Sequence, residues 1–188
     1  MGRWEPDARG RLEQAALDLY LEHGFEQTTV TEIAERAGLT ERTFFRYFAD
    51  KREVLFGGQD TLRTIYVRTI EAAPASTTPL DAVVAALEAT IPLFQERHEL
   101  VRQRQAIIAA NPELQERELL KGAFLASVMA EALRRRGVTD PVARLAAEIG
   151  MILFSTAFAH WVSEPDTQDL SRLIRMALDQ LKGIVAGI

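Results

Sequence analysis

A polar run at residues 40–43 (Thr-Glu-Arg-Thr) and a basic pair at 51–52 (Lys-Arg) flank four aromatic side chains between positions 44 and 48. Threonine hydroxyls and cationic side chains are groups that contact the phosphates and base edges of nucleic acids. Arg42 can donate two hydrogen bonds to guanine, and the methyl group of Thr43 can contact thymine. The whole chain carries a net charge of −5, but residues 40–52 hold four basic against two acidic side chains. Any contact with nucleic acid must therefore be local.

Two sequence patterns upstream of this run predict helices. Between Leu12 and Tyr20, apolar residues recur at the i, i+3, i+4 and i+7 spacing of a buried helical stripe. This helix is expected to end near Gly24, because glycine adopts the positive φ of a helix C-terminus without strain. Thr29 and Glu32 then form a capping-box pattern, which predicts a short helix over residues 29–37.

The polar run itself begins a third helix. Gly38 ends the second helix, Thr40 can cap the third, and the pattern predicts helix over residues 41–48. Phe44 and Phe48 are four residues apart and are expected to face the core together. Two short helices joined by a glycine-containing turn form a helix-turn-helix arrangement. The N-terminal end of its second helix is the part that reaches base edges in the major groove of DNA.

A longer helix is expected to follow from Lys51 to about Ala72, after a second capping box formed by Asp50 and Glu53. At the start of that helix, the Lys51 ammonium and the positive end of the helix dipole can both bind a phosphate. The segment 72–79 (AAPASTTP) is rich in Pro, Ser and Thr and reads as a linker.

Proline marks the starts of later helices. A good N-cap residue precedes Pro79, Pro112 and Pro141, which predicts helices from these positions. Pro92 is expected to interrupt the first of them, with a separate helix beginning near residue 95, and a last helix is expected over about 169–185. About nine helices and no strand predict an all-α protein. Its helix-turn-helix head is placed at 1–56 and its larger helical body at 57–188, with the helix from residue 51 bridging the two.

Several kinds of chemistry lack their residues in this sequence. It contains no Cys, its three His are scattered, and it shows no metal-ligand spacing, phosphate loop or nucleophile elbow. We therefore expect neither an enzyme nor a metal or cofactor site. The segment MGRWEPDARG has no apolar core of a secretory signal, and the apolar stretch at 150–162 is judged too short and interrupted to span a membrane. These features favour a cytoplasmic protein without membrane contact.

The stretch TTVTEIAERAGLTERTFFRYFADKREVL resembles the DNA-binding domain of the TetR family of bacterial transcriptional regulators. Ile33-Ala34, Ala37-Gly38, Thr43, Phe48 and Lys51 fill the family pattern in register, and the likeness extends from about residue 9 to residue 56. It implies a ligand-responsive DNA-binding regulator, most simply a repressor, that binds a near-palindromic operator as a homodimer and is released by a small molecule.

The resemblance also assigns roles residue by residue. It implies that Thr29 caps the first short helix and contacts phosphate, that Thr31 can contact a base, and that Tyr47 and Lys51 hold phosphates. Phe45 departs from the family, which usually has Tyr there, so its polar contact is lost or is replaced by Tyr47 or Arg46. The candidate DNA-binding residues are Thr29, Thr31, Thr40, Glu41, Arg42, Thr43, Arg46, Tyr47 and Lys51.

The body is expected to bind an effector that is apolar or acyl-CoA-like and to dimerise through its last two long helices. The candidate pocket residues are Leu87, Ile91, Phe94, Val101, Arg102, Gln105, Ile108, Phe124, Val128, Phe154 and Phe158. The candidate dimer-interface residues are Gly150, Ala157, Leu170, Leu173, Ile174, Ala177, Leu178 and Leu181. The basic segment 97–104 is either a solvated face or a contact for an anionic ligand.

Two rival functions remain open from the sequence. The first is a helical protein-interaction module whose helix-turn-helix contacts a protein instead of DNA, and the second, less favoured, is an enzyme. Steep loss of DNA affinity with rising salt separates a regulator from an interaction module, because phosphate contacts release counterions.

Overall fold

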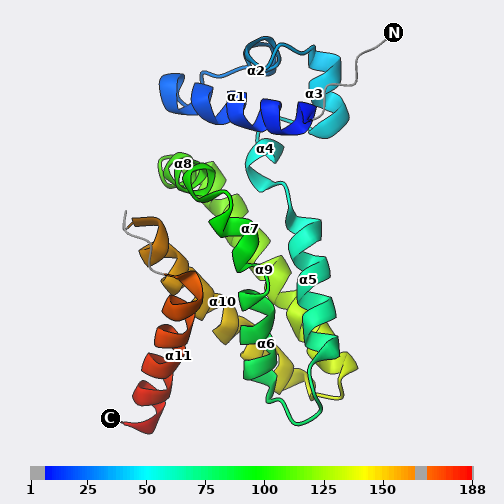
Figure 1. Ribbon diagram of the computed structural model, residues 1–188, viewed down its shortest axis with the longest axis vertical. Helices are drawn as coiled ribbons and strands as arrows, with labels where there is room; N and C mark the ends of the chain where they lie inside the picture. Colours follow the sequence, from blue (N-terminus) through cyan, green and yellow to red (C-terminus); the bar gives the residue numbers. More distant parts are fainter. Residues whose placement is uncertain (1–6, 164–168, 188) are drawn as a thin grey trace. The chain divides into compact units, whose positions relative to one another are not determined.

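The computed structural model describes residues 7–163 and 169–187, and within these ranges the chain is helical without a strand (Figure 1). Residues 1–6 of the N-terminal stretch that was searched for a signal lie outside the described residues. The helices are α1 (Ala8–His23), α2 (Val30–Arg36), α3 (Glu41–Tyr47), α4 (Glu53–Phe56), α5 (Gln59–Ala72), α6 (Pro79–Glu88), α7 (Ile91–Gln95), α8 (His98–Ala109), α9 (Pro112–Arg135), α10 (Asp140–Ser163) and α11 (Leu170–Ala186). The all-α prediction is confirmed. Setting aside α4 and α7, which have only four and five residues, the described helices number the nine expected.

The helix starts predicted at Pro79 and near residue 169 are confirmed, and both depend on local hydrogen bonds. Thr78 accepts a hydrogen bond from the Asp81 N–H at 3.2 Å, one residue before Pro79 begins α6. Asp169 accepts a hydrogen bond from the Ser171 N–H at 3.0 Å and so caps α11. In each case a side-chain oxygen satisfies an N–H group that has no partner inside the helix.

The long helix expected from Lys51 to Ala72 is the main correction to the predicted fold. The structure has two helices there, α4 and α5, separated by Gly57 and Gly58. Gly58 lies at φ 84°, a left-handed conformation that residues with a side chain rarely adopt, and the helix cannot continue through it. Asp50 accepts hydrogen bonds from the N–H groups of Arg52 and Glu53, so it caps the turn that enters α4.

The chain forms two compact units that divide at this glycine pair. The first contains the residues up to Gly57 together with Glu99–Glu118, and the second contains Gly58–His98 and the residues from Leu119 onward. The first unit therefore holds most of α8 and the first turns of α9 in addition to α1–α4. The sequence placed the boundary after residue 56 and assigned Glu99–Glu118 to the body, whereas the structure groups this segment with the first unit.

The first unit has a single apolar core. Phe44 and Phe48 are buried in it, as predicted, and α8 and α9 contribute further buried side chains. The buried members of this core include Leu12, Ala16, Leu19, Tyr20, Ile33, Phe44, Phe48, Leu55, Phe56, Ile107, Ile108 and Leu114. Segments distant in the sequence thus close one core around the helix-turn-helix.

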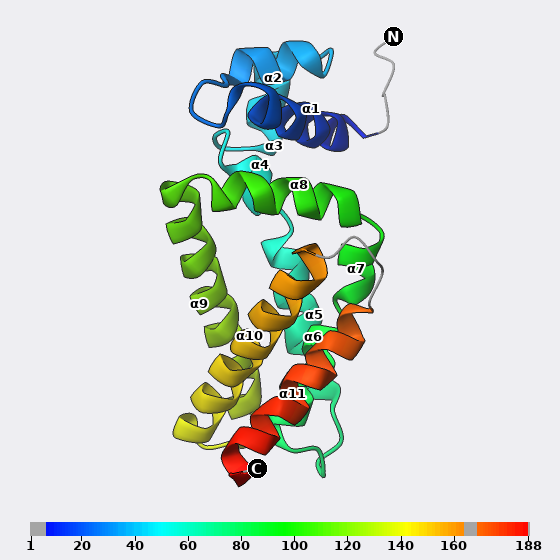
Figure 2. The same ribbon diagram turned by 90° about the vertical axis from the view of Figure 1, so that its left-hand side faces the viewer.

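The second unit is built around α10, which packs against α6 and α11 (Figure 2). Gly150 of α10 lies against α6, where a Cβ atom added to it would be 2.2 Å from Cγ1 of Val83. An aromatic cluster joins α7 to α10, with the ring centroids of Phe94 and Phe154 5.7 Å apart and those of Phe154 and Phe158 5.3 Å apart.

Among the described residues, one helix, α10, has the length and the apolar composition that a membrane-spanning helix needs. The core helix of a soluble protein passes the same test. The expectation that the apolar stretch is too short to span a membrane is therefore wrong for this helix. What the structure shows instead is that α10 buries residues such as Ala146, Leu153 and Trp161 in the second unit.

Candidate nucleic-acid interface

The turn between α2 and α3 is fixed by caps at both helix starts and by one glycine. The Thr29 N–H donates to the Glu32 carboxylate at 2.7 Å, and the Glu32 N–H donates to the Thr29 hydroxyl at 3.2 Å, which completes the predicted capping box. Gly38 lies at φ 64° in the turn, and the Thr40 hydroxyl accepts from the Thr43 N–H at 3.2 Å. Local hydrogen bonds thus set where α2 and α3 begin.

The capping box makes the stability of this turn depend on pH. Hydrogen bonds from the Thr29 N–H and then from its hydroxyl hold the pKa of Glu32 below its ordinary value of 4.5. Because the pKa of this carboxyl is lower in the folded chain than in the unfolded chain, its ionised form stabilises the fold. This stabilisation is complete above the unfolded pKa and is lost as the pH falls through the folded pKa. We expect Glu32→Gln to lower the melting temperature at neutral pH and this deficit to shrink below about pH 4.5. Thermal unfolding at several pH values tests this, with Glu35→Gln as control, because Glu35 is an exposed glutamate of the same helix that takes no part in the capping box.

The surface of α3 carries most of the predicted DNA-binding residues. Phe44 is buried, whereas Glu41, Arg42 and Arg46 are exposed and Thr43 is half-buried. Three pairs of polar side chains bond to each other here. They are Thr31 with Glu41, Thr40 with Thr43, and Arg46 with Tyr47. The structure therefore brings Thr31 of α2 to the start of α3, which the sequence alone did not indicate.

Arg42 differs from these neighbours. In the described parts of the chain no side chain or carbonyl accepts a hydrogen bond from its guanidinium, and it lies exposed in the first turn of α3. An exposed, unpaired guanidinium near the start of such a helix is available for bidentate hydrogen bonds to a guanine.

Lys51 occupies a different place from the one predicted. It lies in the turn before α4 and does not begin a helix, so the helix-dipole argument for a phosphate there is wrong. Its ammonium donates to the carbonyls of Phe25, Glu26 and Thr28 at 2.8, 3.1 and 3.0 Å, and it lies 4.6 Å from the ring centroid of Phe25. An ammonium has three protons, and all three are donated inside the chain.

We expect Lys51→Ala to lower the free energy of unfolding by about 1.5–3 kcal/mol, because it leaves three carbonyls without their charged donor. Chemical denaturation measures this loss. In the arrangement observed, the salt dependence of DNA binding should stay the same, whereas loss of a phosphate contact would reduce the slope of log affinity against log salt by about one. A reduced slope would restore the phosphate role that the sequence suggested for Lys51.

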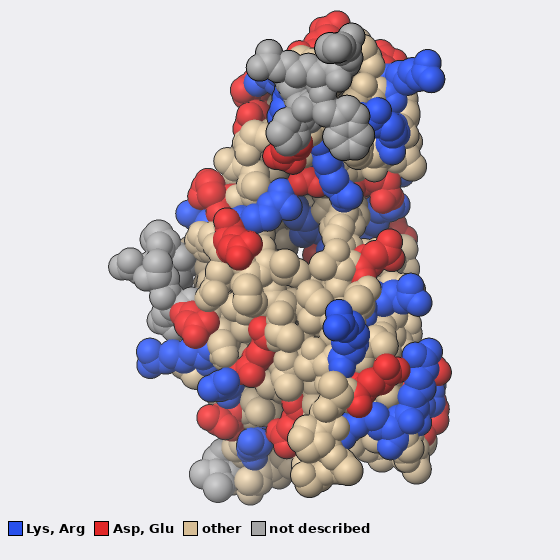
Figure 3. Space-filling view, turned by 45° about the vertical axis from the view of Figure 1, so that its right-hand side comes forward, with Lys and Arg blue, Asp and Glu red and all other residues tan. Residues whose placement is uncertain are grey.

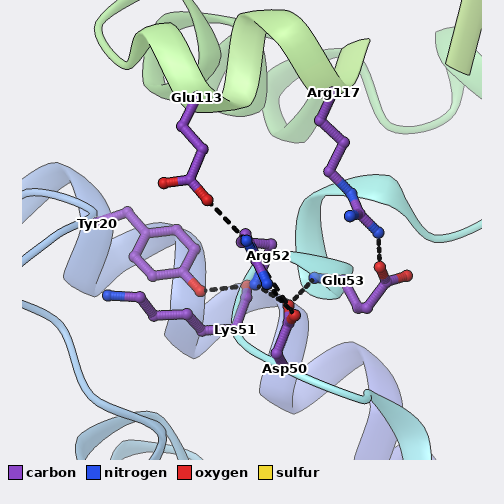
Figure 4. A network of polar contacts seen from close by, with 7 residues as sticks. All are labelled: Tyr20, Asp50, Lys51, Arg52, Glu53, Glu113 and Arg117. Atoms are coloured by element: carbon purple, nitrogen blue, oxygen red, sulfur yellow. Dashed lines mark hydrogen bonds and ion pairs between the residues drawn. The ribbon is translucent and has the colours of Figure 1, made fainter. Parts of the chain in front are cut away.

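A network of arginines and carboxylates holds α4 within the first unit (Figure 4). Arg52 bonds to Asp50 at 2.9 Å and to Glu113 of α9 at 2.7 Å, and Arg117 of α9 pairs with Glu53. Burial alone would raise the pKa of Asp50, but the hydrogen bonds from Arg52 lower it below its ordinary value. The hydroxyl of Tyr20, whose own pKa is raised by burial and then by Asp50, donates to the Lys51 carbonyl at 2.6 Å.

Arg104 and Arg117 make further contacts that fasten α4. The guanidinium carbons of Arg104 and Arg117 lie 5.2 and 5.1 Å from the ring centroid of Phe56, and Arg104 also donates to the Leu55 carbonyl and pairs with Glu118. The basic segment 97–104 was interpreted as either solvated or ligand-binding, but Arg104 has this structural role instead. Sequence reasoning missed Arg104 and Arg117, because nothing local links them to α4.

The predicted pocket residues fall into both units. Leu87, Ile91, Phe94, Phe124, Val128, Phe154 and Phe158 belong to the second unit, and Val101, Arg102, Gln105 and Ile108 lie on α8 in the first. Ile108 is buried in the core of the first unit and is not available to line a pocket. Phe94, Phe154 and Phe158 are half-buried and contact one another in the second unit.

A groove of about 320 Å³ does occur in the second unit, between α9 and α10. Alanine residues of α9 line it, and Arg134, Asp140, Arg144 and Glu148 edge it. None of the predicted pocket residues lines this groove.

The predicted dimer-interface residues are used within the single chain. Gly150, Ala157, Leu170, Leu173, Ile174, Ala177 and Leu178 are buried, and Leu181 is half-buried. They lie on α10 and α11, two helices that pack against each other and against α6 within one chain. The large apolar side chains that α10 and α11 leave exposed are others, among them Leu145, Ile152, Met176 and Ile184.

Basic and acidic side chains are interspersed on the face of the molecule seen in Figure 3. Surface ion pairs in the second unit include Arg134 with Asp140 and Arg135 with Glu71. Neither charge sign forms a broad continuous area on this face.

Comparisons with known proteins cover most of the chain. Residues 13–56 match the family model of the bacterial regulatory proteins of the tetR family, and residues 77–186 match that of the MftR C-terminal domain. The HTH-type transcriptional regulator TcmR of Streptomyces glaucescens is 39% identical over 83 residues, which span 44% of this chain and 37% of TcmR. The putative mycofactocin biosynthesis transcriptional regulator MftR of Mycobacterium tuberculosis is 26% identical over 95% of this chain and 91% of MftR.

Solved structures share the fold. FadR of Thermus thermophilus, a TetR-family transcriptional repressor in complex with lauroyl-CoA, is 23% identical to this chain. The match has a TM-score of 0.55 and covers 92% of each chain.

Proposed function

Because the chain belongs to the TetR family of bacterial regulatory proteins, we propose that it is a ligand-responsive transcriptional repressor that binds a near-palindromic operator. The observation that carries the proposal is the capped helix-turn-helix within residues 13–56, whose second helix presents Arg42 unpaired among the described residues. Residues Thr29, Thr31, Thr40, Glu41, Thr43, Arg46 and Tyr47 are the further candidate DNA contacts, and Lys51 positions the turn.

The operator-binding form is proposed to be a homodimer in the cytoplasm. The exposed side chains of Leu145 and Ile152 on α10 and of Met176 and Ile184 on α11 are between 44% and 77% exposed in the single chain. Apolar surface of this kind on two long helices suits a helical seam between two copies. Two-fold symmetry would place two recognition helices about 34–36 Å apart over successive major grooves, which is the reason for expecting a near-palindrome.

The effector is proposed to be an apolar small molecule, with an acyl chain as the first class to try. The lauroyl-CoA found in the T. thermophilus structure supports this choice, together with the half-buried rings of Phe94, Phe154 and Phe158. Binding would shift the population toward a conformation with lower operator affinity. We infer no catalytic role, since the named relatives are regulators.

Selection of random double-stranded DNA on the purified protein at moderate salt tests the proposal. Enrichment of an inverted repeat, with affinity that falls steeply as salt rises, is the expected result. No enrichment at any salt would favour the alternative of a helical protein-interaction module without DNA binding. The selected operator then serves as the probe for screening acyl-CoA compounds by release of bound DNA.

Arg42→Ala should relax base preference at one position of each half-site by about 1–3 kcal/mol, because a bidentate contact to guanine would be lost. Affinities for single-base variants of the selected operator measure this. Arg63→Ala on α5 removes an equally exposed arginine from the second unit and should leave the preferences unchanged. If Arg42→Ala weakened all sequences equally, Arg42 would be a phosphate contact and not a base contact.

A further inference from the structure

Phe45 is an aromatic ring on the surface of α3. It is 54% exposed, whereas Phe44 and Phe48 beside it are 0% and 3% exposed. The rings of Phe44 and Phe45 meet edge to face, with centroids 5.5 Å apart and an interplanar angle of 84°. Burial in the core therefore explains Phe44 and Phe48. It does not explain Phe45, about half of which is exposed to solvent while its ring packs against Phe44.

The other side chains near Phe45 on this surface are polar, and most are already bonded within the chain. The pairs are Glu41 with Thr31, Thr43 with Thr40, and Arg46 with Tyr47. Arg42 and Phe45 are the members of α3 that are exposed and, among the described residues, hydrogen-bond to no side chain. They lie three residues apart, which places them as neighbours on one side of the helix.

We propose that Phe45 is a specificity-determining residue that contacts the 5-methyl group of a thymine in the operator. The inference rests on the proposed function of the chain as a DNA-binding regulator. A phenyl ring cannot hydrogen-bond to phosphates or to the polar base edges, and the thymine methyl is the apolar group that the major groove displays. Contact with that methyl group would remove apolar surface of both partners from water.

The spacing of Arg42 and Phe45 also predicts the arrangement of the half-site. Three residues of helix rise about 4.5 Å, and successive base pairs are about 3.4 Å apart along the duplex. The thymine should therefore lie one or two base pairs from the guanine contacted by Arg42.

Deoxyuridine, which lacks the methyl group, replaces each thymine of the selected operator in turn, and the affinity of the full-length protein is measured. We expect a loss of about three- to fivefold at one thymine in each half-site, the size of one buried methyl group. Phe45→Ala should bind the thymine and deoxyuridine operators equally. Thr43→Ser tests the rival residue, because the methyl group of Thr43 could also contact a thymine. Thr43 is half-buried and its hydroxyl is engaged with Thr40, so we expect the serine variant, which lacks that methyl group, to keep the sensitivity.

Each other result would overturn the inference. If no deoxyuridine weakened binding of the unaltered protein, Phe45 would not read a methyl group, although DNA binding would stand. Sensitivity that persists in Phe45→Ala, or that disappears in Thr43→Ser, would assign the methyl contact to another residue. The scan of the unaltered protein needs no variant to fold, and Phe45→Leu provides a second apolar variant with an expected partial sensitivity. A protein that retains no DNA in the selection would overturn the proposed function and this inference together.

Discussion

Leu114→Ala is expected to lower the free energy of unfolding by about 2–5 kcal/mol and to loosen the helix-turn-helix, although Leu114 lies far from it in the sequence. Leu114 is 0% exposed and belongs to the same apolar core as Phe44 and Phe56. Removing its isobutyl group leaves a cavity beside the helices that position α3. Hydrogen exchange of the amides in α2 and α3, together with chemical denaturation, measures the effect.

Leu133→Ala is the matched control for this prediction. Leu133 lies on the same helix, α9, and is also 0% exposed, but it belongs to the second unit. Its loss should cost a similar free energy while leaving the exchange of α2 and α3 unchanged. Equal acceleration of exchange in α2 and α3 by both variants would mean that residues 99–118 are not a distinct part of the DNA-binding unit.

The parts of the fold that follow from local chemistry could be predicted from the sequence. Thr29, Thr40 and Thr78 each accept a hydrogen bond from an N–H group three residues later, so a short stretch of sequence is enough to place their helix starts. The inward position of Phe44 and Phe48 likewise follows from their spacing alone.

The parts that depend on distant partners could not be predicted in this way. The three carbonyls around the Lys51 ammonium belong to residues 25–28, and the partners of Arg52 and Glu53 belong to α9. The break between α4 and α5 is different, because the Gly57-Gly58 pair is visible in the sequence and is a recognised signal of a turn. The capping pattern at Asp50 and Glu53 indicates where a helix begins but not how far it continues.

The burial of the candidate dimer-interface residues within one chain could not be predicted, for a related reason. Periodicity identifies which face of a helix is apolar but not whether a helix of the same chain or of a second copy covers it. Leu173 and Ile174 lie on the most regular apolar stripe of α11 and are buried within one chain. The less regular Met176 and Ile184 are exposed and remain candidates for a partner.

Gly150→Ala should lower the free energy of unfolding by about 1 kcal/mol, the balance of about 1–3 kcal/mol of overpacking and about 1 kcal/mol of gained helix propensity. The new Cβ atom would lie 2.2 Å from Cγ1 of Val83, a buried β-branched side chain whose rotamer in a helix is nearly fixed. Gly122→Ala on α9 is the matched control, because its Cβ atom would have Met151 Cε at 3.8 Å as its nearest neighbour, and it should stabilise by about 0.5–1 kcal/mol. Chemical denaturation of both variants tests the difference in sign. Val83→Ala should also cost less in the Gly150→Ala background than alone, and simple additivity of the two changes would contradict the proposed clash.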